Sequence, residues 1–458
     1  MTTESDVPAP AHLAKQHPQM GSMAAALRMR LEQLPQLNIT FNNTPPPSRY
    51  CHRRELSDDV ASATSSLSNH SFGSRRSTLS NASDATDVTD MTLTPFRSRA
   101  GTLEKMDTTI PTMSTTTLTT PVAHREPAKP PLRVVLGTAS VGSAQSPLAK
   151  ITTVEDLQQF VSKFRSRGYL DIDTARAYPV GRGGSCEKLL GAEELRLSKW
   201  ANVSTKVSSF MPGSHRTKNI ALSIERSLEA LNTDSVDIMY LHAPDRATPF
   251  KETCEAMHNA FLDGKFERFG LSNYTVEQVE EILKVCEENG FVKPSVYQGQ
   301  YNPICRGAEE RLLTLLRANN IAFYAYSPSA CGFFSSKVTR SSVKDKDSRW
   351  NIASPLGAKY SGDYFQDPLF AAAAIVRQVA TRYGITGHAA ALRWTTWHSE
   401  LGAEYGDAII IGASKLEQLA ENLDILEQGP LPDPLLETMN GVWEDVKNLD
   451  KGPRFSFV

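Results

Sequence analysis

Two hydrophobic periodicities alternate along the chain from about residue 131 onward. Short apolar runs such as Leu132–Leu136 and Val236–Leu241 are typical of buried strands. Between such runs, apolar residues recur every three or four positions, as on one face of an amphipathic helix; one such stretch lies between residues 154 and 164, and Gly168 ends it. This alternation predicts a parallel sheet with helices around it.

Eight strand signals occur in this part of the chain, which makes a (β/α)8 TIM barrel the expected fold. The barrel domain is expected to cover residues 131–458, more than the usual length of about 250 residues. The predicted strands cover residues 132–136, 169–173, 203–206, 236–241, 266–271, 295–298, 321–326 and 408–411.

A long segment without strong periodicity, residues 327–367, follows the seventh predicted strand. Loops of this length inside a compact domain are usually functional, so we assign the segment to cofactor or substrate contact. It contains Lys337, Arg349 and Tyr360. A glycine-rich stretch, residues 181–187, is interpreted as a turn and helix start, because its glycines do not follow a strand directly, as a Rossmann fingerprint requires.

Residues 1–130 differ from the rest in composition. Between Cys51 and Thr120, serine and threonine make up roughly four residues in ten, and long apolar runs are missing. Such a segment buries too little apolar surface to offset the entropy lost on ordering. We therefore predict a disordered arm, rich in Ser, Thr and Pro, before the barrel.

Charge and cysteine usage exclude several classes of function. The formal net charge of -2 and the lack of long basic runs argue against nucleic-acid binding. The longest apolar stretches are strand-sized and the first residues are acidic, so neither a membrane span nor a leader is expected, and the cytoplasm is the expected compartment. The six cysteines are scattered, which is typical of reduced thiols, and no metal site is expected.

Candidate chemistry gathers where three consecutive predicted strands end. Asp173, Lys206 and His242 stand at these ends, and Tyr178 follows the first of them. Barrel enzymes keep their active sites at the carboxyl ends of the strands. A phenol has a pKa near about 10, so we expect the Lys206 charge to lower the pKa of Tyr178 and Asp173 to pair with Lys206. His242 is expected to orient a carbonyl oxygen.

These residues carry a family resemblance. Asp173-Thr-Ala-x-x-Tyr178, Ser204-Thr-Lys206 and Tyr240-Leu-His242 resemble the catalytic tetrad of the aldo-keto reductases in order, spacing and strand position. The resemblance implies reduction of aldehydes or ketones to alcohols, with Tyr178 as proton donor. Because no side chain can supply a hydride, a nicotinamide cofactor is implied as well.

The resemblance also implies where the cofactor binds. Residues 272, 273 and 298 match positions that hydrogen-bond the carboxamide, and Tyr326 matches the aromatic that stacks on the nicotinamide. Ser414 and Lys415 begin a helix, with Glu417 completing a predicted capping box, and a helix start with a cation suits the phosphate of NADPH. The expected cofactor-binding residues are Ser272, Asn273, Gln298, Tyr326, Lys337, Gly412, Ser414, Lys415, Gln418 and Asn422.

Within the family, Val296–Asn302 and Ile411–Gln418 look most like the aflatoxin-aldehyde-reductase branch, which implies a small carbonyl substrate and a homodimer. The stretch 329–334 departs from that branch, so the substrate is not carried over. An alternative is a cofactor-binding regulatory subunit, since potassium-channel β subunits share this barrel and have N-terminal extensions. A short-chain dehydrogenase is less favoured, because no tyrosine has a lysine four residues after it.

Overall fold

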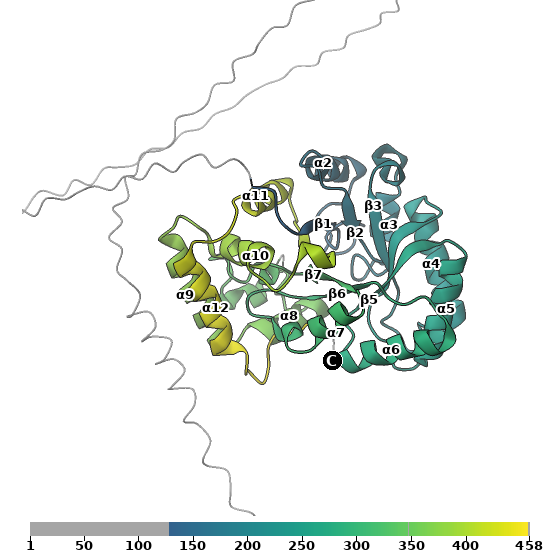
Figure 1. Cartoon of the computed structure of the whole chain (residues 1–458). Coiled ribbons are helices and arrows are strands. Elements are labelled where there is room, and N and C mark those ends of the chain that lie inside the picture. The colour runs from purple at the N-terminus through teal and green to yellow at the C-terminus, as the bar shows by residue number, and fades with distance from the viewer. Residues whose placement is uncertain (1–127, 347, 457–458) are drawn as a thin grey trace, which may run out of the picture. The chain divides into compact units, whose positions relative to one another are not determined.

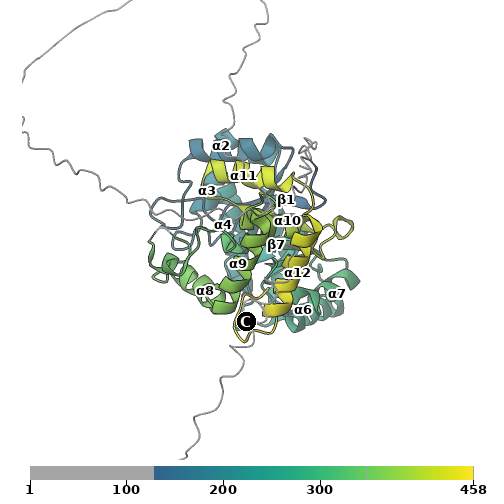
Figure 2. The same cartoon turned by 90° about the vertical axis from the view of Figure 1, so that its left-hand side faces the viewer.

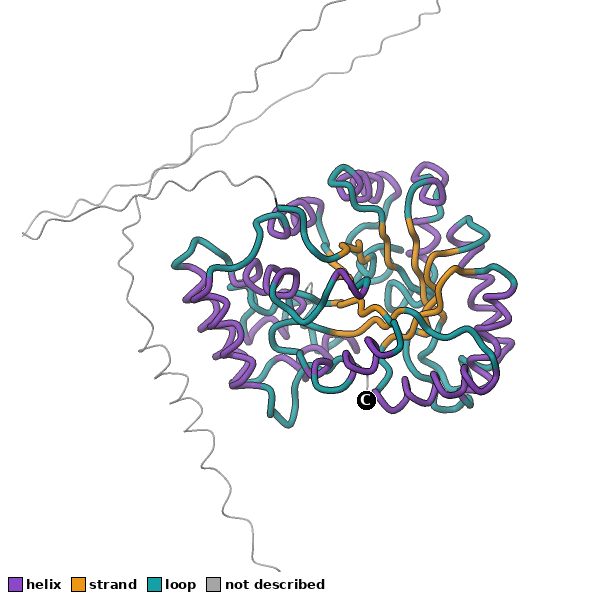
Figure 3. The backbone as a smooth tube through the Cα atoms, in the orientation of Figure 1, coloured by secondary structure: helices purple, strands orange, loops and turns teal. Residues whose placement is uncertain are grey.

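A computed structural model of the protein describes residues 128–346 and 348–456. Eight parallel strands pair in chain order, and the last pairs with the first, so the sheet closes into a barrel inside a ring of helices (Figures 1 and 3). The predicted (β/α)8 barrel is confirmed, whereas residues 1–127 of the predicted arm lie outside the described residues. The strands are β1 (Arg133–Gly137), β2 (Asp171–Asp173), β3 (Asn202–Val207), β4 (Val236–Leu241), β5 (Phe266–Ser272), β6 (Val296–Gln300), β7 (Ala322–Tyr326) and β8 (Ala408–Gly412).

Amphipathic helices cover the outside of the barrel. In the first of them, Thr153 accepts a hydrogen bond from Asp156 N at 3.1 Å and so caps the helix. Among the described residues, none of these helices is both long and apolar enough to cross a membrane. They are α2 (Val154–Arg165), α3 (Ser185–Leu190), α4 (Thr217–Leu231), α5 (Phe250–Leu262), α6 (Val276–Asn289), α7 (Leu312–Ala318), α8 (Pro355–Tyr364), α9 (Asp367–Thr381), α10 (Gly387–Trp397), α11 (Leu416–Leu426) and α12 (Asp433–Val446).

Side chains rather than solvent fill the barrel interior. Tyr240 is fully buried there, and a side chain at Gly270 of the neighbouring β5 would lie 2.3 Å from its ring. Near the amino ends of the strands, Arg268 forms an ion pair with Asp237 at 2.7 Å. This filling makes the barrel a packed core, so chemistry is confined to its rim.

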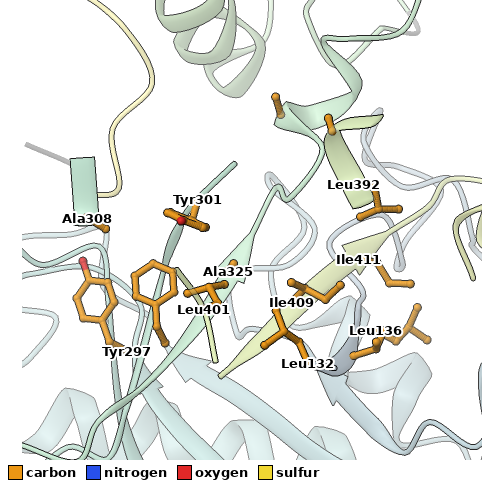
Figure 4. Packing of buried hydrophobic residues seen from close by; sticks show 14 of the residues in the cluster. Leu132, Leu136, Tyr297, Tyr301, Ala308, Ala325, Leu392, Leu401, Ile409 and Ile411 are labelled. Carbon is orange, nitrogen blue, oxygen red and sulfur yellow. The ribbon is translucent and has the colours of Figure 1, made fainter. Parts of the chain in front are cut away.

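A larger apolar core lies between the strands and the helices. Leu136 and Ile411, which are in register across the β1–β8 pair, lie side by side, with Leu392 of α10 nearby (Figure 4). All three are almost completely buried. Burial of this apolar surface at the seam supports closure of the barrel.

The segment after β7 is more regular than we predicted. It includes α8, which begins where Ser354 accepts a hydrogen bond from Gly357 N at 3.0 Å and Pro355 occupies the first turn. The prediction of a loop over residues 327–367 was therefore wrong for residues 355–364. An aromatic cluster, here called the α8 cluster, holds this helix, and α9 and α12 lie side by side next to it (Figure 2). The cluster contains Phe333, Trp350, Tyr364, Phe365 and Phe370.

Candidate active site

A buried ion pair joins the carboxyl ends of β2 and β3. Lys206 has no exposed surface, and its Nζ donates to Asp173 Oδ1 at 2.8 Å, to Asp173 Oδ2 at 2.7 Å and to the Thr174 carbonyl at 2.7 Å. Burial lowers the pKa of Lys206, and the adjacent Asp173 opposes that change. These three acceptors compensate the cost of removing the ammonium from water.

Tyr178 lies on the loop after β2, beside this pair. Its ring centroid is 5.1 Å from Lys206 Nζ and 5.6 Å from the ring centroid of His242. Burial raises the pKa of Tyr178 well above its ordinary value, and the charge of Asp173 adds to this. The expected net lowering of the Tyr178 pKa by Lys206 was wrong, because burial of the phenol is the largest effect on it. The phenol is protonated at neutral pH, as an ordinary phenol is, and the raised pKa favours this form further.

His242 follows β4 and is held through its backbone. Its N–H donates to Ser209 Oγ at 3.1 Å, and its carbonyl accepts from Asn273 Nδ2 at 2.9 Å. Burial, followed by the Lys206 charge, lowers the pKa of His242 well below its usual value, so the imidazole is neutral. Its Nδ1 is buried without a hydrogen-bond partner in the described part of the chain.

The ends of β5, β6 and β7 bring four of the predicted cofactor residues into one network. Asn273 Nδ2 donates to Ser272 Oγ at 2.9 Å, and its Oδ1 accepts from the Tyr326 hydroxyl at 2.8 Å. Gln298 Nε2 donates to Asp173 Oδ1 at 2.8 Å, so this amide is also linked to the ion pair. The network fixes the Tyr326 ring, which is partly exposed at the rim.

Five of the six remaining predicted cofactor residues lie at the start of α11 or within it: Gly412, Ser414, Lys415, Gln418 and Asn422. The capping box predicted from Ser414 and Glu417 was wrong, because Lys415 is the N-cap of α11. Ser414 instead donates hydrogen bonds from its N–H and its hydroxyl to Gln418 Oε1, at 3.0 and 2.7 Å. Asn422 Nδ2 donates to the Gly412 carbonyl at 3.3 Å. Lys337, from the segment after β7, is exposed, as is Lys415.

Sequence reasoning missed the apolar side chains beside His242. Phe210 lies on the loop after β3, with its ring centroid 4.9 Å from that of His242, and it is 54% exposed. Met211 is 70% exposed. The sequence did contain a signal for these side chains, because two large apolar residues follow a few positions after the strand-end Lys206. Both are suited to an apolar substituent on the substrate.

Helix α8 supplies a further side chain near the phenol. Tyr360 is close enough to Tyr178 to contribute to its raised pKa, after burial and Asp173. Arg349 precedes the helix, and Cys331, also in this segment, lies 3.1 Å from Ser327 Oγ through its thiol. The predicted contact of this segment with cofactor or substrate stays a prediction.

The arc from β5 to α11 fits a nicotinamide dinucleotide. It offers an aromatic face at Tyr326, amides at its base, and a helix start where the first N–H groups have no partner within the helix. An exposed lysine stands at that helix start, where the dipole favours an anion. The side chains present therefore match the chemical groups of such a cofactor.

Comparison with known proteins assigns the family. The model of the aldo/keto reductase family matches residues 133–444. An aldo-keto reductase of Pseudocercospora fijiensis is 36% identical over 302 residues, which cover 64% of this chain and 98% of the relative. Aflatoxin B1 aldehyde reductase member 2 of Mus musculus is 36% identical over 352 residues, which cover 73% of this chain and 92% of the relative.

A further relative, oxidoreductase sirO of Leptosphaeria maculans, is 34% identical over 327 residues, which cover 70% of this chain and 96% of the relative. These matches confirm the resemblance to the aldo-keto reductases inferred from the tetrad motifs, and the one to aflatoxin aldehyde reductases inferred from Val296–Asn302 and Ile411–Gln418. The chain therefore belongs to the aldo/keto reductase family, whose members are nicotinamide-dependent oxidoreductases of carbonyl compounds.

Proposed function

We propose that the protein reduces aldehydes or ketones to alcohols with NADPH, and that Tyr178 is the proton donor. The observation that carries this proposal is the buried Lys206–Asp173 pair beside a protonated phenol and a neutral imidazole. An acid and a hydrogen-bond donor directed at one oxygen are what carbonyl reduction requires.

The residues divide the work as follows. His242 Nε2–H hydrogen-bonds the carbonyl oxygen and orients it toward Tyr178. Bound at the β5–α11 arc, the nicotinamide supplies the hydride. Tyr178 gives its proton to the oxygen as negative charge develops there, and the Lys206 ammonium stabilises the phenolate that is left. Asp173 keeps Lys206 in position through its two short hydrogen bonds.

The preference for NADPH rests on the helix start at Lys415. The additional phosphate of NADPH accepts hydrogen bonds from the free N–H groups of this helix start and pairs with the lysine charge. NADH has an uncharged ribose hydroxyl instead, which gains much less from either interaction. The substrate is an aldehyde or ketone with an apolar substituent, in keeping with Phe210 and Met211. A homodimer and a cytoplasmic location stay predictions from the sequence.

The first test is a carbonyl panel with the full-length protein and its Tyr178→Phe variant. We expect Tyr178→Phe to bind NADPH as before and to lose about 10²–10⁴-fold in kcat, the usual effect of removing a general acid. Tyr405→Phe is the matched control, because Tyr405 is 49% exposed and precedes β8, away from the rim. An unchanged rate in Tyr178→Phe would remove the proton-donor assignment.

No specific observation favours the alternative of a regulatory subunit. The two functions still differ in a measurable way, because a subunit that keeps its cofactor oxidises one NADPH per chain and then stops. Sustained consumption of NADPH with a reactive aldehyde supports the reductase. A single turnover followed by arrest would support the regulatory subunit instead.

A further inference from the structure

A fully buried carboxylate behind the site has no part in the proposed chemistry. Glu187, on the short helix α3, has no exposed surface. Its Oε2 accepts from Arg176 Nη1 at 2.7 Å, and its Oε1 accepts from Thr205 Oγ1 at 2.7 Å. Buried carboxylates are costly unless paired and hydrogen-bonded, so a specific arrangement is maintained here.

The two partners of Glu187 belong to the two segments that carry the proposed acid and its ammonium neighbour. Arg176 lies two residues before Tyr178, on the same loop, and Thr205 directly precedes Lys206 in β3. A backbone hydrogen bond joins the same two segments, since Arg176 N–H donates to the Lys206 carbonyl at 3.0 Å. Glu187 therefore links the Tyr178 loop to the strand of Lys206 through one side chain.

The glycine-rich stretch before α3 makes room for this link. A side chain at Gly184 would lie 2.5 to 2.9 Å from three atoms of the Arg176 guanidinium, and Gly184 has a φ of +83°. A side chain at Gly183 would lie 2.9 Å from the Arg176 carbonyl oxygen. The close approach explains why glycines stand here, and it indicates that the guanidinium position is specified by the fold.

We propose that Glu187 is a positioning residue, which sets the place of the Tyr178 side chain relative to Lys206 by holding Arg176 and Thr205 together. This inference rests on the proposed function of Tyr178. A displacement of about 1 Å in a reacting group can cost about 10²-fold in rate, so a link two residues from the phenol can affect catalysis without touching substrate. The Glu187 charge also favours the ammonium form of Lys206, after the larger effects of burial and Asp173.

Full-length Glu187→Gln and Thr205→Val variants test the link by hydrogen exchange and by kinetics. In Glu187→Gln we expect amide exchange over residues 174–187 to speed up about tenfold and kcat to fall about tenfold, because the loop loses a charged attachment. The NADPH dissociation constant should change less than about twofold, since the β5–α11 arc is untouched. The double variant should be no slower than Glu187→Gln alone, because both changes break one link.

Asp407→Asn is the matched control. Asp407 is a buried carboxylate paired with Arg317 at 2.6 Å, and it precedes β8 at the opposite end of the barrel. It should lower thermal stability without changing loop exchange or kcat.

Any one of three results would overturn the inference: an unchanged exchange rate in Glu187→Gln, an unchanged kcat in Glu187→Gln, or additive losses in the double variant. If Glu187→Gln does not fold, Thr205→Val is judged by the same two readouts. An inactive wild-type protein would instead reject the proposed function, while loop exchange would still report on the link.

Discussion

Burial decides the protonation of the groups at the rim. The phenol of Tyr178 and the imidazole of His242 are both pushed toward their neutral forms, since desolvation penalises either charge. Burial lowers the pKa of Lys206 as well, and Asp173 beside it is the main group that opposes this. The result is a neutral acid and a neutral hydrogen-bond donor around one charged pair, which is the state a carbonyl reduction needs at the start.

His215 makes stability depend on pH. Burial lowers the pKa of His215 to about 4, whereas an unfolded histidine titrates near about 6.5. The unfolded chain therefore binds this proton more readily than the folded protein. The contribution of His215 to the free energy of unfolding is complete above pH 6.5 and is lost as pH falls toward 4. We expect the free energy of unfolding to fall by about 2 kcal/mol from this residue between pH 7.5 and 5. Urea unfolding of the wild type and His215→Gln at both pH values checks this.

The difference in the free energy of unfolding between pH 7.5 and pH 5 should be smaller in the variant than in the wild type, by about 2 kcal/mol. Equal differences in the two proteins would contradict the assignment. His242, also buried and neutral, adds to the slope in both proteins and does not obscure the comparison.

Lys415 should decide the choice between cofactors. Lys415→Ala removes one charged partner of the proposed phosphate site, an interaction of about 1.5–3 kcal/mol, so NADPH binding should weaken about 10- to 100-fold. NADH binding should change little, because NADH has no phosphate at that place. Fluorescence titration of both cofactors measures this, with Lys359→Ala on α8, outside the proposed phosphate site, as control. Equal weakening of both cofactors would contradict the phosphate site.

At the scale of elements, local patterns located most strands, while the segment after β7 was misjudged. The apolar residues of that segment do not recur with a helical period over a long run, because its aromatic side chains pack against one another across 14 to 17 positions of the same segment. Trp350 shows this, since its ring is near Phe333 and Tyr364 as well as Phe365. The cap at Ser354 with Pro355 was the local signal that could have found α8.

Trp350 should hold α8 against the barrel. The side chain is 3% exposed, so Trp350→Ala is expected to cost about 3–5 kcal/mol of unfolding free energy. Because Tyr360 of α8 is near Tyr178, the variant should also raise KM for the carbonyl substrate. Trp200→Ala, at the start of β3 on the opposite end of the barrel, should destabilise without raising KM. An unchanged KM in Trp350→Ala would show that the position of α8 does not affect substrate binding.

At the scale of the molecule, closure of the barrel places the site. Asp173 and Gln298 are 125 positions apart in the chain, yet their side chains are 2.8 Å apart, because parallel strands bring all carboxyl ends to one rim. The same closure pairs β1 with β8 and brings the start of α11 to the rim as well.

Deletion of residues 1–127 should leave the barrel intact. The described residues close the sheet and bury both apolar cores, so we expect the melting temperature to change by less than about 4 °C, equivalent to under about 1 kcal/mol. The kcat should stay within about twofold of the full-length value. Differential scanning fluorimetry and steady-state kinetics on both proteins check this, and a clear loss in either would give the first segment a role in the fold or in catalysis.

The sequence by itself determined the barrel class and the family, because hydrophobic periodicity and the spacing of Asp173, Tyr178, Lys206 and His242 are local properties of the chain. The predicted roles of the site residues stay predictions, although these residues meet at one rim. Only the tertiary structure decided that the pKa of Tyr178 is raised, because this shift depends on burial and on Asp173. It also decided the link through Glu187, since desolvation and contacts between distant segments arise only when the chain has folded.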